Sequence, residues 1–544
     1  PVPRIALSAT LGNLDDIPQA LRQNADIPCT ILKSDAVQSE LKFKVQGYVN
    51  PFQDTDAKPA FYQMCDDLYQ FCRGGSHLVF ANSRKNTEAI SAQLSDKCEQ
   101  DVVPNEFFPH HGSLHKHLRE ALEDRLQQDN LPTTAICTMT LELGIDIGKV
   151  DSVIQVTPPH SVSSLRQRLG RSGRRGSPAV LRMLIDEDEI HADSHIVNKL
   201  RIGLLQSLAI TRLLIIHKWY EPADMGRFHF STLLHQILAL IAQWGGIRAD
   251  QVYRLLCKKG CFNHVTVEQF KKLLSHMGEE NLIVQLSSGE LVLGLKGEFL
   301  TNKYTFYAVF KTPEEFRVIT GDKTLGTLPV DSPILEEQHI IFTGRRWKVE
   351  SIDKDKKIIQ VSPAKGGKPP EFSGEGMLVH DLVRQEMFRI YESEDYRIPS
   401  EHGQVDYLDA TAKALFDEGL EFFKAASLKD RRIFENNGDV FIVPWMGDKI
   451  VNTITAMLMK SGYTASAFAG VIEVEKTTLP EVINCLKTIC EENSMTNTDL
   501  AMGVPNIKVE KYDDALPECL LIEGYGQRCF DVKNAILWLK KWLP

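Results

Sequence analysis

Short apolar segments alternate with helical stretches between about Phe43 and Ile190, and this alternation most strongly limits the folds open to the chain. The predicted strands are mainly apolar runs over 77–80, 134–137, 153–156 and 180–185. A predicted helix over 86–96 follows the first run, and a helical stretch over 193–218 follows the last. Apolar strands separated by helices indicate a parallel sheet covered on both faces. We therefore expect an α/β domain in this part of the chain.

The pattern changes after about residue 226. Three helical patterns over 233–241, 249–258 and 267–279 precede a hairpin signal, in which strands over 282–284 and 291–293 flank Gly289. Ser231 is the expected N-cap of the first helix. Three helices and a hairpin in so short a segment predict a winged helix over 226–297.

The remaining sequence predicts a second mixed region. Residues 305–363 are rich in strand and turn signals, which predicts a small antiparallel β-barrel or sheet. Amphipathic helices and short strands follow, so we expect 298–544 to form an α+β domain that starts with this barrel. A length of 544 residues is consistent with three or four such units.

Composition excludes several classes of protein. Apolar stretches such as 237–241 are far shorter than the roughly 18 to 20 residues that a membrane span requires. The N-terminus lacks the order of a secretory signal, so we expect a cytoplasmic protein with no membrane partner. Cys257, Cys261 and His264 are the nearest approach to a metal set, but they lack ligand spacing, and we expect free thiols and no metal site.

The segment 166–175 points most directly to chemistry. It holds five arginines interleaved with Gly170 and Gly173, within a chain whose net charge is −10. Glycines are poor helix formers and allow a ligand to approach the backbone closely. One guanidinium group can donate two parallel hydrogen bonds to the oxygens of a phosphate. The segment therefore predicts a local phosphate-binding site on an otherwise acidic protein.

Segment 167–175, Gln-Arg-Leu-Gly-Arg-Ser-Gly-Arg-Arg, resembles motif VI of superfamily 2 helicases and translocases. Four further segments follow the order of helicase motifs: 8–10 (Ser-Ala-Thr) resembles motif III, 80–84 (Phe-Ala-Asn-Ser-Arg) motif IV, 110–114 (His-His-Gly-Ser-Leu) the next phosphate-contacting turn, and 138–148 motif V. The sequence of 141–148, Leu-Glu-Leu-Gly-Ile-Asp-Ile-Gly, most resembles that of the Lhr family of large helicase-related proteins. Segments 343–349 and 369–376 resemble the start of that family's own domain.

This resemblance implies a RecA-like motor domain over 41–225, with 1–40 as the end of a first RecA-like domain and its linker. The chain contains no Gly-x-x-x-x-Gly-Lys-Ser/Thr loop. We therefore expect the C-terminal part of a longer helicase, or one half of a split one. Its missing first RecA-like domain would be a partner in the same or a separate chain, and the chain alone would not hydrolyse ATP.

The family resemblance also implies roles for single residues. Arg171 and Arg174 would counter charge on the γ-phosphate of ATP, Gln167 would hold the cleft closed, and Mg²⁺ ligands would belong to the missing domain. Nucleotide contacts are expected from Gly144, Asp146 and Gly170. Motif III, Ser8, Ala9 and Thr10, would couple the two motor domains. Contacts with single-stranded or partly duplex nucleic acid are expected from Asn82, Ser83, Arg84, His111, Gly112, Ser113, Thr138, Trp347 and Phe372.

Several alternatives stay open from sequence alone. Trp347 and Phe372 could stack on bases or be core side chains of the barrel. The helix over 267–279 could bind duplex or form a structural hinge. A non-catalytic nucleic-acid-binding or scaffold protein derived from a helicase is the main alternative function. A transcription-factor-like winged-helix protein is the second, although Lys271 and Lys272 are offset by Glu268, Glu279 and Glu280.

Overall fold

The computed structural model describes most of the chain. The described residues are 5–8, 10–18, 29–33, 40–52, 59–142, 147–173, 177–224, 226–310, 315–321, 323–329, 339–342, 345–353, 356–363, 378–400, 403–492, 494–502, 504 and 507–543. Their contacts divide the chain into two compact units, one of residues 36–221 with 313–430 and one of 1–35 with 222–312 and 431–544. The segment 298–544, expected as one domain, is thus shared between both units.

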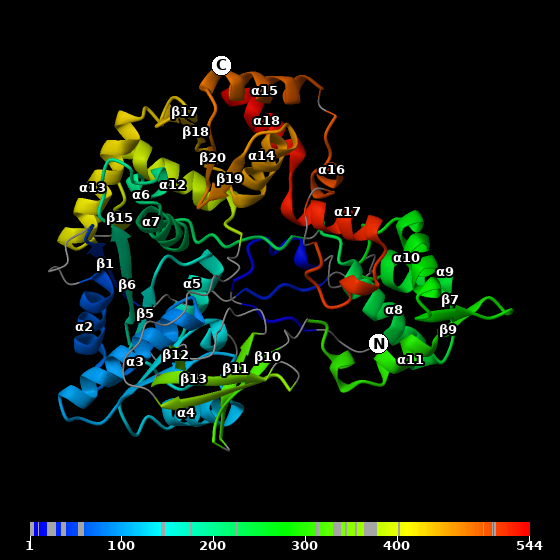
Figure 1. Cartoon of the computed structure of the whole chain (residues 1–544), viewed down its shortest axis with the longest axis horizontal. Coiled ribbons are helices and arrows are strands. Elements are labelled where there is room, and N and C mark those ends of the chain that lie inside the picture. The colour runs from blue at the N-terminus through cyan, green and yellow to red at the C-terminus, as the bar shows by residue number, and fades with distance from the viewer. Residues whose placement is uncertain are drawn as a thin grey trace. The chain divides into compact units, whose positions relative to one another are not determined.

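A six-stranded parallel sheet forms the centre of the first unit, which confirms the expected α/β fold (Figure 1). The strand order is β1-β6-β5-β2-β4-β3. The strands are β1 (Leu41–Asn50), β2 (Ser76–Phe80), β3 (Phe107–His110), β4 (Thr133–Cys137), β5 (Ser152–Val156) and β6 (Ala179–Asp188). The helices are α2 (Ala60–Cys72), α3 (Arg84–Gln100), α4 (Lys116–Gln128), η1 (Met139–Leu141), α5 (Val162–Leu169), α6 (Ile196–Lys199) and α7 (Ile202–Ile215).

Helices cover both faces of this sheet. Helices α2 and α3 pack on one face, where Leu68 and Ile90 share an apolar cluster with Val79 of β2. Successive strand residues point to opposite faces. Leu78 is as fully buried as its neighbour Val79 but lies outside that cluster, so the second face is covered as well. Helices α4, α5 and α7 contact the sheet strands there.

Within the first unit, a five-stranded sheet packs against the turn after β3. Its strands are β10 (Glu315–Thr320), β11 (Lys323–Pro329), β12 (His339–Phe342), β13 (Arg345–Asp353) and β14 (Ile358–Pro363), in the order β11-β10-β14-β13-β12. Leu114 from the turn joins the core of this sheet, and the His115 N–H donates to the Leu325 carbonyl at 3.2 Å. The expected small β-structure therefore exists, but it is mixed rather than antiparallel, because β10 pairs with β14 in parallel. Closure into a barrel stays a prediction.

Helices α12 (Asp381–Ser393) and α13 (Ala410–Ala425) also belong to this unit, with β15 (Ile398–Ser400) and β16 (Gly403–Val405) between them. The chain before α13 runs beside β1, where Val45 donates to the Tyr407 carbonyl at 2.9 Å. Arg201 at the start of α7 is paired with Glu418 of α13 at 2.6 Å. Arg212 in α7 is paired with the buried Glu386 of α12 at 2.8 Å. Two arginines thus fasten the later helices to α7.

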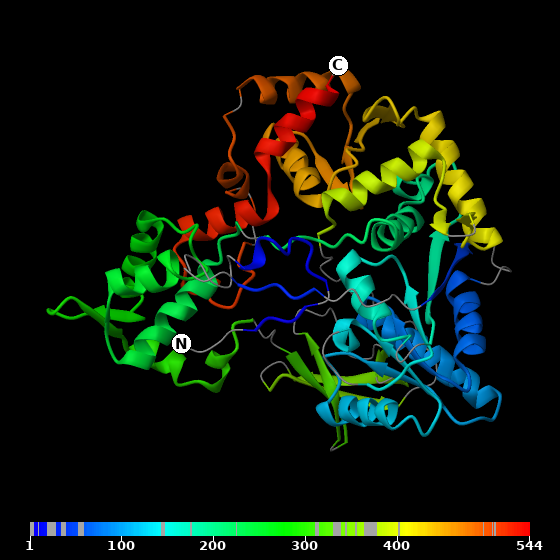
Figure 2. The ribbon, with the colours of Figure 1, turned by 180° about the vertical axis from the view of Figure 1, so that it is seen from behind.

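The second unit contains the three helices and hairpin expected over 226–297. Strands β8 and β9 form the hairpin, which projects from the helices (Figure 2). The elements are α8 (Phe230–Trp244), β7 (Ile247–Arg248), α9 (Ala249–Tyr253), η3 (Arg254–Lys258), α10 (Val267–Glu279), β8 (Ile283–Gln285), β9 (Glu290–Leu293), α11 (Leu295–Thr301) and η4 (Tyr304–Tyr307). The prediction that Ser231 caps the first helix is wrong: α8 begins one residue earlier, and the Ser231 hydroxyl accepts from the Tyr512 N–H at 2.9 Å.

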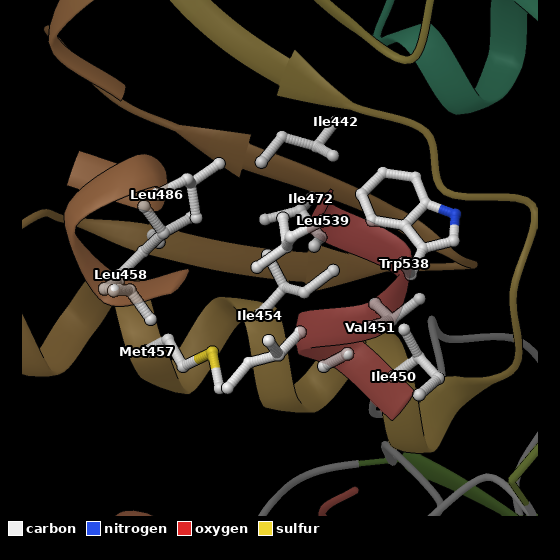
Figure 3. Close-up of a cluster of buried hydrophobic side chains, with 14 of the residues drawn as sticks. Ile442, Ile450, Val451, Ile454, Met457, Leu458, Ile472, Leu486, Trp538 and Leu539 are labelled. Atoms are coloured by element: carbon white, nitrogen blue, oxygen red, sulfur yellow. The ribbon is translucent and has the colours of Figure 1, made fainter. Parts of the chain in front are cut away.

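The rest of this unit is an α+β region with its own hydrophobic core. Its sheet has the order β17-β18-β20-β19, and Ile442 and Ile472 pack there against Leu539 and other side chains (Figure 3). The elements are β17 (Ile433–Asn436), β18 (Asp439–Ile442), α14 (Asp448–Lys460), β19 (Ala465–Phe468), β20 (Val471–Val474), α15 (Leu479–Glu492), α16 (Asn497–Ala501), η5 (Asp513–Ala515), α17 (Glu518–Cys529) and α18 (Val532–Trp542). Among the described residues, no helix has both the length and the apolar character that a bilayer crossing requires.

Candidate functional site

Three of the predicted strand-binding segments meet at one edge of the parallel sheet. Residues 82–84 follow β2, 111–113 follow β3, and Thr138 follows β4, so all three stand at the carboxyl ends of neighbouring strands. The Thr138 N–H donates to the His110 carbonyl at 3.3 Å, and the Ala81 N–H donates to the Cys137 carbonyl at 2.9 Å. Ligands of open α/β sheets bind at this edge.

Asn82 uses its side chain inside the domain. Its backbone is left-handed, with φ +55°, which asparagine tolerates better than most residues. Its amide nitrogen donates to Thr157 Oγ1 at 3.0 Å and to the Pro158 carbonyl at 2.8 Å. Ser83 caps α3 by accepting from the Asn86 N–H at 3.1 Å, and Arg84 begins that helix. Asn82 and Ser83 therefore shape the turn that leads into Arg84 and α3.

The turn after β3 presents little side chain to solvent. His111 is buried, and its Nε2 lies 2.8 Å from the carboxylate of buried Glu88. The Ser113 side chain is buried too, whereas Gly112 is exposed with open space around its Cα. This geometry favours a positioning role for His111 and Ser113 and leaves Gly112 as the accessible point of the turn.

His110 is a positioning residue that the sequence did not single out. Its Nδ1 lies 2.7 Å from Thr140 Oγ1, and its Nε2 lies 2.9 Å from Glu123 Oε1. Burial lowers the pKa of this imidazole below its ordinary value, against the opposing effect of Glu123. A neutral His110 therefore ties helix α4 to the segment that follows β4.

Arg168 joins the motif-like segments to one another. Its side chain is 1% exposed, and its Nε donates to Glu142 Oε2 at 2.9 Å. Its Nη1 donates to Asn82 Oδ1 at 2.9 Å and to Gln155 Oε1. The guanidinium also lies 4.7 Å from the centroid of the Phe80 ring, within range of a cation–π interaction. One arginine of α5 thus bonds to the turn after β2, to β5 and to the segment after η1.

Arg171 and Gln167 lie close to this network. Arg171 is buried, and its Nη2 donates to the Glu142 carbonyl at 2.8 Å. Gln167 is half-buried, and the neighbouring Gly170 is exposed at the end of α5. Arg174, Gly144 and Asp146 lie outside the described residues. The proposed phosphate contacts of all these residues stay predictions.

Glu221 holds the amino end of α5. Its carboxylate accepts from the Val162 N–H at 2.7 Å and from the Ser163 N–H at 2.9 Å. Unpaired N–H groups and the helix dipole make this end favourable for a negative charge. Ser161 adds a second cap by accepting from the Ser164 N–H at 3.1 Å. Sequence spacing gave no sign of Glu221, because it lies more than fifty residues downstream.

Motif III belongs to the other unit. Ser8 is exposed, Thr10 is buried, and the Thr10 N–H donates to Ser8 Oγ at 3.3 Å. Asn13 accepts from the Ala223 N–H at 2.9 Å, which anchors this segment to residues just before α8. Ala9 lies outside the described residues.

The stacking interpretation of Trp347 is wrong. The indole is 7% exposed and packs with Leu114, Val349 and other side chains in the core of the five-stranded sheet. A base cannot stack on a ring that its own sheet covers. Phe372, the other candidate, lies outside the described residues.

Comparison with known proteins finds similarity to helicases. Residues 62–176 match the helicase conserved C-terminal domain. Over 456 residues the chain is 25% identical to the ATP-dependent helicase Lhr-Core of Methanocaldococcus jannaschii, which covers 80% of this chain and 50% of that protein. The chain is similar to Lhr helicases over most of its length.

A second relative and a solved structure show the same similarity. The ATP-dependent helicase Lhr-Core protein 2 of Thermococcus barophilus is 24% identical over 389 residues, 67% of this chain and 42% of the relative. The chain thus spans half or less of the length of these two relatives. A solved structure of the Mycobacterium smegmatis helicase Lhr bound to ssDNA and AMP-PNP shares the fold, with a TM-score of 0.65, 17% identity and coverage of 98% of this chain and 72% of that one.

Proposed function

We propose that this Lhr-like chain supplies the second motor domain of an ATP-dependent helicase or translocase that acts on DNA. This proposal rests on one observation: Arg168 of α5 donates hydrogen bonds to Asn82, in the turn after β2, and to Glu142, in the segment after η1. The helix with the predicted phosphate contacts and the turns with the predicted nucleic-acid contacts are thereby parts of one bonded structure. Such a structure suits a motor, in which nucleotide state and strand grip must change together.

The proposed ATP site lies between this domain and a first RecA-like domain. Arg171 and Arg174 would counter the negative charge on the γ-phosphate, and Gln167 would hold the cleft closed. Gly144, Asp146 and Gly170 would contact the rest of the nucleotide. Mg²⁺ would be held by residues of the first domain and would neutralise the phosphate charge. Because Arg171 bonds to the Glu142 carbonyl, it would have to exchange this partner for phosphate when ATP binds.

The proposed strand crosses the carboxyl edge of the sheet. Arg84, Gly112 and Thr138 would contact its phosphates, which carry no sequence information. The solved Mycobacterium smegmatis relative is bound to ssDNA, which supports DNA as the substrate. The 3′-to-5′ direction comes from the family resemblance. We also propose that 226–297 is a winged helix, since helices α8, α9 and α10 precede the β8–β9 hairpin in this segment.

The competing function is a helicase-derived protein that binds nucleic acid without catalysis. The absence of a phosphate-binding Gly-Lys-Ser/Thr loop from these 544 residues favours it. Strand-displacement assays with the complete protein separate the two functions. Unwinding of a duplex with a 3′ tail but not of one with a 5′ tail, dependent on ATP, supports the motor. Tight strand binding without ATP-dependent unwinding on either substrate supports the competing function.

A further inference from the structure

The pair of Arg168 and Glu142 connects the two halves of the proposed motor site. One carboxylate oxygen of Glu142 accepts from Arg168 at 2.9 Å and from the Ser164 hydroxyl at 2.7 Å, while its backbone carbonyl accepts from Arg171 at 2.8 Å. The other end of the Arg168 guanidinium reaches Asn82 at 2.9 Å. Phosphate-side and strand-side residues are therefore joined through two residues, Arg168 and Glu142.

Because both side chains are buried, the free energy lost on removing their charges from water offsets much of the stability that the pair contributes. Its side chains are 1% and 8% exposed, so both charges are removed from water. Buried ion pairs often stabilise a fold no more than well-packed apolar residues would. Their geometry, however, is fixed by several directed bonds. The guanidinium is a rigid fork whose nitrogens can hold Glu142 and Asn82 at the same time, which a lysine ammonium on a flexible chain does not reproduce.

We propose that Arg168 and Glu142 are positioning residues that couple nucleotide contact to strand contact. The pair holds Arg171 through the Glu142 carbonyl and holds the turn at Asn82 through the guanidinium. A shift of α5 upon ATP binding then moves the strand-contacting turn with it. The coupling rests on the proposed function, whereas the positioning itself is a property of this domain and is measurable without ATP.

The test substitutes Arg168→Lys, which keeps the charge and removes the fork. The matched control is Arg212→Lys, because Arg212 also donates from Nε to a buried carboxylate, Glu386, at 2.8 Å, and from Nη1 to a second acceptor, the Arg397 carbonyl, at 2.7 Å. Arg212 lies between α7 and α12, away from the predicted contacts. Both variants are expected to melt within about 4 °C of each other.

Hydrogen exchange of the 544-residue chain gives the first readout. Arg168→Lys should speed exchange about tenfold over 80–84 and 138–142, with the rest of the domain unchanged, because only the bonds at this edge are loosened. Arg212→Lys should leave these two segments at the wild-type rate. Equal exchange of both segments in the Arg168→Lys variant and the wild type would overturn the positioning role.

ATP turnover of the complete protein gives the second readout. Arg168→Lys should lower the strand-stimulated kcat about 10²-fold, the size of effect expected from a displaced contact, with the KM for ATP little changed. Arg212→Lys should keep the wild-type kcat. Normal stimulated turnover in Arg168→Lys would overturn the coupling. A wild-type protein without turnover would contradict the proposed function instead, and the exchange result would still decide the positioning role. If Arg168→Lys does not fold, Glu142→Gln replaces it in both measurements with the same expected results.

Discussion

Trp347 shows how burial decides the role of a single residue. Its indole fills the core of the five-stranded sheet, so we expect Trp347→Ala to lower the free energy of unfolding by about 3 to 5 kcal/mol. Strand affinity per folded molecule should be unchanged, because the ring does not face a ligand. Thermal melting and fluorescence anisotropy check the two expectations, with Trp347→Phe as a milder control. Weaker binding at an unchanged melting temperature would restore the stacking role.

Glu187 gives a pH dependence of known sign. Burial raises the pKa of its carboxyl to about 7 from 4.5, against the opposing effects of the Leu204 N–H and Arg201. The folded protein therefore keeps a proton that the unfolded chain releases. This contribution to stability is complete below about pH 4.5 and is lost as the pH rises to about 7.

Glu187→Gln should remove this dependence. The wild type should lose on the order of 3 kcal/mol between pH 4.5 and pH 7.5 relative to the variant, which cannot titrate. Urea unfolding of both proteins at the two pH values measures the difference. A stability gap between them that does not change with pH would contradict a raised pKa.

The order of residue types in the sequence was enough to locate the motif-like segments. It was not enough to predict which of their side chains are buried and which are accessible to a ligand. Five arginines stand within ten residues, and the sequence could not tell that Arg168 is the one buried in a network. The sequence offered one sign of its partner: Glu142 is a charged residue between two leucines, which suggests that it is buried and paired. Likewise, His111 looks like a surface ligand in the sequence, yet its side chain turns inward to Glu88, which lies on a different element.

At the scale of elements, Asp409 fastens α13 to β1. Its carboxylate accepts from the Ala412 N–H at 2.7 Å as an N-cap and from the Gly47 N–H at 3.1 Å. Asp409→Ala should lower the free energy of unfolding by about 1 to 2 kcal/mol, because both N–H groups lose their acceptor. Asp409→Asn keeps an acceptor oxygen and should lose less. Chemical denaturation of the three proteins tests this, and equal midpoints would show that the cap contributes nothing.

Elements with local signals were predictable, and elements that depend on distant segments were not. The hairpin around Gly289 and strands β2, β4, β5 and β6 follow from short apolar runs and turn residues. Strand β1 alternates apolar and polar residues, and β3 is only four residues long with a proline, so neither carries the signature of a buried strand. Nothing local indicates that residues 313–430 return to the parallel sheet, because the partners are more than a hundred residues away.

At the scale of the whole molecule, a net charge of −10 must be reconciled with binding to a polyanion. The proposed contacts are few and local, so the logarithm of strand affinity should fall with the logarithm of salt with a slope of about −0.7 for each phosphate neutralised. Affinity should hardly depend on base sequence. Anisotropy titrations of labelled oligonucleotides at several salt concentrations measure both. Strong sequence preference with a shallow salt slope would favour base recognition instead.

We propose that this domain brings arginines to an ATP site that is completed by another RecA-like domain. The most direct test of this proposal is ATP turnover by the complete protein, with and without single-stranded DNA, in the wild type and in Arg174→Ala. We predict strand-stimulated turnover in the wild type and a kcat about 10³-fold lower in the variant, the magnitude typical of a lost arginine finger, with strand affinity unchanged. Near-normal stimulated turnover in Arg174→Ala would contradict the claim.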